Sequence, residues 1–256
     1  MGNTPRVIIH LLIINIIFFF GSKVSGAISN DFLALHYFEI DKFIISQLFT
    51  HLFMHGNEAH LFFNMFGLWM FGSTLANIWG TNKFLFFYIS SGLGAAIVQM
   101  IMYYLNIDSV TSTLLEYGVS NEIILNILKT GSANPMIFEY VPQSKLASMV
   151  GDYNAVMVGA SGAIYGVLVA FTFMFPNSKL MLLFPPIPVK AKYLIPLIIL
   201  GDFFFGFTSA SIGPIAHFAH IGGAFTGFVM MWYWKNNQFN KNRWNLKIKL
   251  SFIYRG

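Results

Sequence analysis

Two short motifs carry residue types that can perform acyl-transfer chemistry. Ser161 lies in a Gly-x-Ser-Gly motif at residues 159–162, and His220 lies in Ala-His-Ile-Gly-Gly at residues 219–223. A serine hydroxyl becomes an effective nucleophile when a base removes its proton, and a histidine imidazole does this near neutral pH. The sequence therefore predicts a serine–histidine pair, provided that the two side chains meet.

A third motif supplies hydrogen-bond donors. His60 and Asn64 are four residues apart, which places both on one face of a helix. A tetrahedral intermediate needs donors directed at its oxygen, and the Asn64 amide, the His60 ring and the backbone N–H of Ser161 can provide them. We therefore expect an oxyanion hole at His60 and Asn64. Interhelical hydrogen bonding is the structural alternative for both side chains.

The residues around the pair indicate how it is supported. Tyr165 follows Ser161 by about one helical turn, and we expect its ring to pack under His220; ordinary core packing is the alternative. Small residues let two helix backbones approach closely. The glycines available for this contact are Gly159, Gly162, Gly223 and Gly227. We therefore expect the helices that carry Ser161 and His220 to touch.

The remaining ionisable groups are assigned lesser roles. Asp202 is expected near the middle of its own helix without an evident partner, so the site is predicted to be a dyad. His217 is expected at the exterior rim. His51 and His55, together with the nearby histidine of the third motif, raise the alternative of a metal site. However, the chain has no His-Glu-x-x-His motif and no cysteine, so neither a metal nor another cofactor is expected.

The composition indicates where such a site must lie. The 256 residues are 56% hydrophobic and 10% charged, against about 25% charged in soluble domains, and include 29 Phe. A soluble domain could not cover so much apolar surface with so few charges. The absence of cysteine excludes a disulfide framework, thiolate metal sites and a cysteine nucleophile. The chain is therefore expected to be an integral membrane protein.

Stretches free of charge predict the membrane-spanning helices. A helix needs about 20 apolar residues to cross a bilayer, and residues 59–82, 84–107 and 153–178 qualify. Two more helices are expected between Lys192 and Lys235, separated by a turn at 208–214, and a first one over 7–24. The first segment also fits a cleaved signal peptide. The predicted fold is all-α: a six-helix membrane domain over residues 1–235, with an exterior loop at 106–152 and a basic tail at 236–256.

Charge asymmetry predicts the orientation. Most of the fifteen Lys and Arg residues fall on one side of these six spans, and nearly all of the ten Asp and Glu residues fall on the other. The positive-inside rule then places both termini in the cytoplasm. The basic tail is expected to bind anionic membrane lipids rather than nucleic acid. If the fourth helix starts near Tyr153 and the sixth near Pro214, Ser161 and His220 lie about 12 and 9 Å deep at 1.5 Å per residue.

Taken in this order, the three motifs resemble those of the rhomboid intramembrane serine proteases. The resemblance covers roughly residues 40–105 and 150–235 and includes the 47–55 approach to the second helix. It implies a six-helix bundle with Ser161 as nucleophile, His220 as general base and then acid, and His60 and Asn64 lining the oxyanion hole. It also implies that the fifth helix, rich in phenylalanine at 203–207, moves as a lateral gate. Two departures are a missing acid within 72–80 and a long 109–150 loop, in which a short amphipathic helix is expected at 121–128.

The expected function follows from this resemblance. We expect a multi-pass serine endopeptidase that hydrolyses peptide bonds in or near transmembrane segments of single-span membrane proteins, in the bacterial cytoplasmic membrane. One alternative is a proteolytically inactive rhomboid-like protein that binds client helices. Another is a small transporter, but the chain shows no internal symmetry of the kind expected for one. The sequence does not indicate an oligomeric state.

Overall fold

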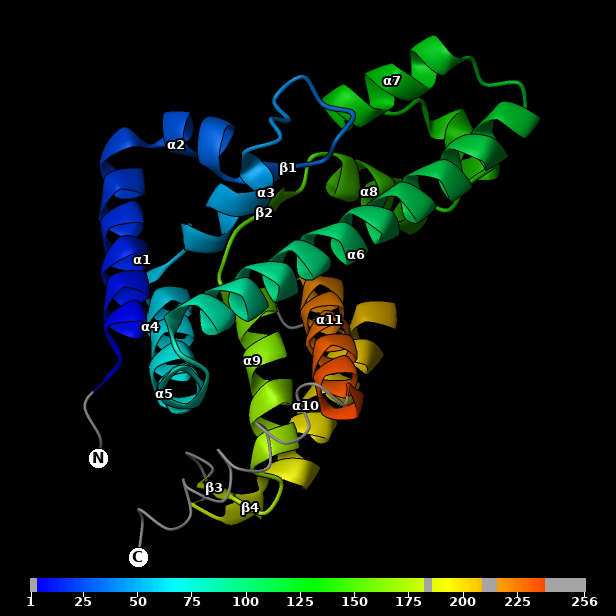
Figure 1. The fold of residues 1–256 in the computed structure, drawn as a ribbon. Coiled ribbons are helices and arrows are strands. Elements are labelled where there is room, and N and C mark those ends of the chain that lie inside the picture. Colours follow the sequence, from blue (N-terminus) through cyan, green and yellow to red (C-terminus); the bar gives the residue numbers. More distant parts are fainter. Residues whose placement is uncertain (1–3, 182–185, 209–215, 238–256) are drawn as a thin grey trace, which may run out of the picture.

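The computed structural model describes residues 4–181, 186–208 and 216–237, and these are mostly helical (Figure 1). Most of the turn expected at 208–214 and nearly all of the expected basic tail lie outside the described residues. The elements, in chain order, are α1 (Arg6–Ser25), α2 (Ala27–Leu33), β1 (Leu35–His36), α3 (Gln47–Thr50), η1 (His51–Phe53), α4 (Glu58–Gly67), the π-helical turn η2 (Leu68–Gly72), α5 (Ser73–Trp79), α6 (Thr81–Glu116), α7 (Asn121–Thr130), η3 (Pro135–Glu139), α8 (Gln143–Tyr153), β2 (Val156–Met157), α9 (Ser161–Met174), β3 (Lys179–Met181), β4 (Pro188–Lys190), α10 (Ala191–Phe207) and α11 (His217–Asn236).

Three helices of the described chain are long and apolar enough to cross a membrane. They are α1, the continuous stretch α4–η2–α5 over Glu58–Trp79, and α6. The shorter α9 is also apolar. The helices α10 and α11 lie in the region where two helices were expected, so a helix is present in each of the six predicted segments.

Helices α6, α9 and α11 pack together through small residues. A Cβ atom added to Gly94 of α6 would lie 1.9 Å from Thr226 Oγ1 of α11, and one added to Gly166 of α9 would lie 2.3 Å from Ser91 Oγ of α6. Apolar surface gains nothing by leaving lipid for another apolar surface, so close van der Waals contact holds such helices together. The glycines therefore set the distances between the helices that carry the candidate site.

The segment between α6 and α9 is helical rather than an open loop. At 36 residues α6 is about 54 Å long, much longer than the roughly 30 Å of a hydrocarbon core. Its last turns, α7 and α8 pack together at one end of the molecule (Figure 1). The buried apolar residues of this cluster include Ile107, Val110, Leu114, Ile127, Leu146 and Met149. The helix expected at 121–128 is confirmed as α7. The expectation of a loop over the rest of 106–152 was wrong. Further helices form there because apolar residues at helical spacing are interspersed with polar ones.

The chain does not enter α9 as a helix starting at Tyr153. Tyr153 ends α8, and Val156–Met157 then pairs with Leu35–His36 in a short antiparallel sheet. Gly159 follows with φ +124°, a conformation that favours glycine, and α9 begins at Ser161. Ser161 is therefore reached through an extended segment, and the depth calculated from a helical rise beginning at Tyr153 was wrong.

The two ends of the molecule differ in structure. The start of α1, the end of α11 and the β3–β4 hairpin lie toward one end, whereas α2, α7 and α8 lie toward the other (Figure 1). The hairpin pairs Lys179 with Lys190. Basic residues thus collect at the end where α1 begins and α11 ends.

Candidate active site

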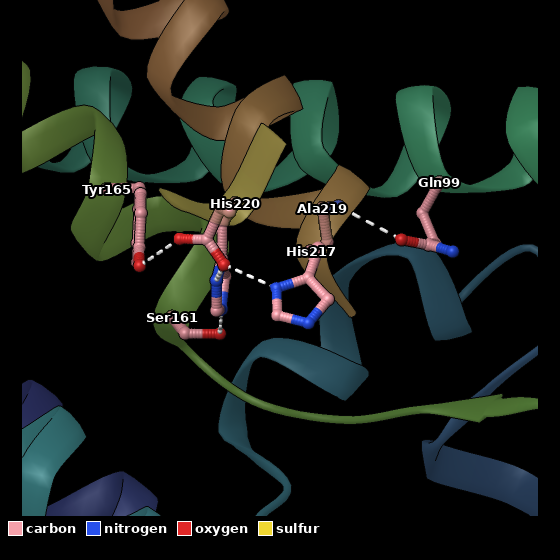
Figure 2. A network of polar contacts seen from close by, with 7 residues as sticks. Gln99, Ser161, Tyr165, His217, Ala219 and His220 are labelled. Atoms are coloured by element: carbon pink, nitrogen blue, oxygen red, sulfur yellow. Dashed lines mark hydrogen bonds and ion pairs between the residues drawn. The ribbon is translucent and has the colours of Figure 1, made fainter. Parts of the chain in front are cut away.

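Ser161 and His220 are in contact. Ser161 is the first residue of α9, His220 lies in the first turn of α11, and Oγ is 2.9 Å from Nε2 (Figure 2). Both residues are only partly buried. The contact predicted from the two motifs is therefore present, and a substrate atom has room to approach it.

Glycines bring the two residues together. A Cβ atom at Gly223 would lie 1.9 Å from the carbonyl oxygen of Gly162, and one at Gly227 would lie 2.7 Å from the Cα of Gly166. The backbones of α9 and α11 therefore touch next to Ser161 and His220. The expected glycine-mediated contact is confirmed.

Asp202 of α10 is the part of the site that sequence reasoning missed. Its Oδ1 accepts hydrogen bonds from Nδ1 of His220 at 3.1 Å and from Nδ1 of His217 at 2.6 Å. Its Oδ2 accepts one from the Tyr165 hydroxyl. The expectation that Asp202 has no evident partner was therefore wrong. An intramembrane acid was the available signal, but nothing in the sequence indicated which helices Asp202 faces.

The carboxylate determines which nitrogen of His220 carries the proton. An ionised carboxylate only accepts hydrogen bonds, so Nδ1 must be the donor. In the neutral ring Nε2 is then the acceptor, and it is the atom that faces the hydroxyl of Ser161. The geometry therefore suits transfer of the serine proton to Nε2.

His217 and Tyr165 complete the surroundings of this carboxylate. His217 is 8% exposed, so the expectation that it lies at an exterior rim was wrong. The ring of Tyr165 stacks on that of His220, with centroids 4.1 Å apart and planes 11° apart, as expected.

The first turn of α11 is also held by Gln99 of α6, whose Oε1 accepts the N–H of Ala219 at 3.0 Å (Figure 2). Gln99 was not predicted, although a buried amide in a charge-free span was a signal for it.

His60 and Asn64 lie beside the segment that leads into Ser161. A Cβ atom at Gly159 would lie 2.8 Å from Nε2 of His60 and 3.8 Å from Nδ2 of Asn64. The Asn64 Nδ2 group is buried and has no hydrogen-bond partner among the residues that the structure describes. The first backbone N–H groups of α9 also lack acceptors within the helix. Several donors thus gather near Ser161, and one of them is a buried amide without an acceptor.

His51 and His55 lie next to these donors and to the segment that leads to Ser161. His51 Nδ1 donates to the Gln47 carbonyl at 2.7 Å, and the His51 carbonyl accepts the N–H of Gly159 at 2.9 Å. Burial lowers the pKa of both histidines to about 4, so both are neutral at pH 7. Within the described ranges, no three His, Asp or Glu side chains converge as metal ligands would. His51 thus fixes the backbone that leads to Ser161, whereas the His55 ring packs edge-on against that of His60, with centroids 5.1 Å apart.

The fold and the site together define a class: a helical membrane protein with a serine, an imidazole and a carboxylate in hydrogen-bonded sequence between its helices. The family model of the Rhomboid domain matches residues 43–129 and 130–237, and the chain belongs to the rhomboid family.

Individual relatives agree with this membership. The chain is 24% identical over 183 residues to the mitochondrial Rhomboid protein 1 of Saccharomyces cerevisiae, covering 71% of this chain and 39% of that protein. It is 23% identical over 233 residues to the rhomboid protease GluP of Bacillus subtilis, covering 89% and 34%. It is 26% identical over 211 residues to the human mitochondrial presenilin-associated rhomboid-like protein, covering 77% and 41%. The chain therefore spans less than half the length of each of these relatives.

Proposed function

We propose that the protein is an intramembrane serine endopeptidase in which Ser161 is the nucleophile and His220 the general base. The observation that carries the proposal is the 2.9 Å contact between Ser161 Oγ and His220 Nε2. Catalytic hydrogen bonds of this kind fall between about 2.6 and 3.2 Å. Membership of the rhomboid family, which includes a relative named as a protease, supports it further.

The proposed reaction proceeds in two stages. His220 Nε2 takes the Ser161 proton as Oγ attacks the substrate carbonyl carbon, and the resulting oxyanion accepts hydrogen bonds from the Asn64 amide, His60 and the N–H of Ser161. The protonated imidazole then gives its proton to the leaving amine, and an acyl-enzyme remains. A water molecule, deprotonated by His220, hydrolyses the ester and restores Ser161. The two imidazole roles need a ring that is held in place, which the stacked Tyr165 provides.

The proposed substrates are single-span membrane proteins cut in or near their transmembrane segments. The surface of α10 next to the site supports this, because Phe203, Phe204 and Phe207 are each more than half exposed, as suits contact with lipid or with an apolar helix. The proposal includes six membrane crossings and both termini in the cytoplasm, since the charge pattern follows the positive-inside rule. The bacterial cytoplasmic membrane is the proposed location, and the similarity to GluP of Bacillus subtilis supports it.

Cleavage of a model single-span substrate in liposomes tests the proposal. We expect Ser161→Ala and His220→Ala each to lower kcat by about 10⁴-fold or more, the effect of disabling a serine nucleophile or its base. Matched controls are Ser144→Ala on α8 and His10→Ala on α1, both exposed positions, which we expect to cleave like the wild type. A fluorophosphonate probe is expected to label the wild type and the controls only. Equal cleavage by Ser161→Ala and wild type would refute the proposal, and substrate binding without cleavage would indicate a proteolytically inactive member.

A further inference from the structure

The carboxylate of Asp202 is held by three side chains. His217 and His220 of α11 donate to Oδ1, and Tyr165 of α9 donates to Oδ2. Asp202 is only 8% exposed. A buried carboxylate is costly unless it is paired and hydrogen-bonded, and here both of its oxygens are engaged. Asp202 is thus fixed in position from two neighbouring helices.

The nitrogen of His220 that donates to Asp202 indicates a role in the reaction rather than a role only in holding helices together. To hold α10 against α9 and α11, the Asp202 carboxylate would need only a hydrogen-bond donor somewhere on those helices. Asp202, however, bonds the nitrogen of His220 on the other side of the ring from the one that faces Ser161. An acceptor at this place selects one tautomer and stabilises the ring when it becomes positively charged.

We propose that Asp202 is a positioning residue that extends the catalytic pair to a Ser161–His220–Asp202 triad. It holds the Nδ1–H tautomer of His220, so that Nε2 is free to take the serine proton, and it stabilises the imidazolium that results. His217 and Tyr165 in turn orient the carboxylate. This inference rests on the proposed function and adds to it a third member, from a different helix.

Among the described groups around His220, Asp202 is the one that can balance a positive charge on the ring. The groups that face or neighbour this ring are Ser161 and Tyr165 from α9, Asp202 from α10, His217 from its own helix α11, and His60 from α4. Asp202 is the acid among them. The charge that forms on His220 during the reaction is therefore balanced by this one side chain within the part of the chain that the structure describes.

The placement of the acid also links α10 to activity. Ser161 and His220 come from α9 and α11, which are fixed to each other by glycine contacts, whereas the acid comes from α10. The Asp202–His220 bond is 3.1 Å long and would be lost if α10 moved outward by about 1 Å, because such bonds end near 3.2 Å. Full activity therefore requires α10 to be seated against both neighbours.

Substitution of Asp202 by asparagine tests the role of its charge. Asparagine has the same size, its oxygen can still accept from Nδ1 of His220, and the hydroxyl of Tyr165 can turn to accept from the new amide. We expect kcat to fall about 10- to 100-fold, the range that hydrogen bonds to charged groups contribute, with KM within about twofold. We also expect the acid limb of the pH–rate profile to move to lower pH, because the imidazolium loses its counter-ion. Asp202→Ala, which also frees the ring to rotate, is expected to lose about 10³- to 10⁴-fold.

The controls separate this inference from the proposed function and from a merely structural role. Asp108→Asn, at an exposed position of α6, is expected to behave like the wild type. If Asp202→Asn keeps the wild-type kcat and pH profile while Ser161→Ala is inactive, the inference is overturned and the proposed function stands. If Ser161→Ala also cleaves normally, the proposed function fails instead. If kcat of Asp202→Asn falls only in step with a lower melting temperature, with an unmoved pH profile, the role is structural and the inference is overturned. The asparagine variant keeps the test decisive even if the alanine variant does not fold.

Discussion

Replacing Gly223 by alanine tests whether the contact between Ser161 and His220 depends on the backbone contact between α9 and α11. A Cβ atom at this position would lie 1.9 Å from the carbonyl oxygen of Gly162, 2.6 Å from its carbonyl carbon and 3.1 Å from its Cα. All three obstructing atoms belong to the backbone, so no side chain can rotate to make room. Ordinary contact begins at 3.4 Å. The two helices must therefore separate by about 1.5 Å at this point, the difference between 3.4 and 1.9 Å.

The size of the effect follows from where the contact lies. Gly162 directly follows Ser161, and Gly223 lies about one helical turn after His220. A separation of about 1.5 Å added to the present 2.9 Å would place Oγ and Nε2 about 4.4 Å apart, well outside hydrogen-bond range. Because a misplacement of about 1 Å costs on the order of 10²-fold, we expect kcat to fall by about 10²- to 10³-fold. Overpacking of this kind also destabilises a protein by about 1–3 kcal/mol.

The assay compares kcat for a single-span substrate in liposomes, fluorophosphonate labelling and the melting temperature in detergent. Gly21→Ala on α1 is the matched control, because nothing lies within 4 Å of an added Cβ there, and it should match the wild type in all three measurements. A Gly223→Ala protein that folds and keeps both wild-type turnover and wild-type labelling would refute the argument. The Ser161–His220 contact would then not depend on the spacing of the two helices.

Three further substitutions or conditions are expected to separate the roles of neighbouring groups. Tyr165→Phe keeps the ring stacked on His220 and loses only the hydroxyl donated to Asp202, so kcat should fall less than about tenfold; Tyr165→Ala removes the support as well and should lower kcat by about 10²-fold in the same assay. Asn64→Ala removes a buried amide donor and should lower kcat by about 10²- to 10³-fold with KM little changed in steady-state kinetics. Burial lowers the pKa of His51 to about 4, so its contribution to stability is present above pH 6.5 and is lost as the pH falls toward 4. The melting temperature should therefore decline through that window, with a contribution from His51 equivalent to about 3 kcal/mol at 1.36 kcal/mol per pKa unit, and should decline less in His51→Asn.

Each of these expectations has a control at an exposed position. Tyr193→Phe on α10, Asn126→Ala on α7 and His10→Asn on α1 should leave activity and melting unchanged. Full activity in Tyr165→Ala would show that the stacked ring is not needed to hold His220. Full activity in Asn64→Ala would remove that amide from the oxyanion hole. A melting temperature that is constant between pH 6.5 and 4 would show that His51 is not held in its neutral form.

The contact between Ser161 and His220 could be predicted because each sequence feature on which it depends spans only a few residues. A serine between glycines, a histidine before two glycines, and a tyrosine one turn after the serine are each readable within a few residues, and all three contacts are present. The scarcity of charge likewise predicts membrane helices, because apolar length alone decides whether a helix can span a bilayer. The short helix α7 was predicted near its observed bounds because an amphipathic pattern is likewise local.

Other features depend on how separate elements meet, which the local pattern does not contain. The extended entry into α9 depends on pairing between Val156–Met157 and Leu35–His36, more than a hundred residues apart in the chain. The burial of His217 and the partners of Asp202 depend on the rotation of α10 about its axis relative to α9 and α11. A mostly apolar helix carries little pattern from which that rotation can be derived. The residue types and membrane setting of this site were therefore determined by the sequence, whereas the carboxylate behind His220 was decided by tertiary packing, because a hydrogen bond between helices requires a particular distance and rotation that only the assembled helices define.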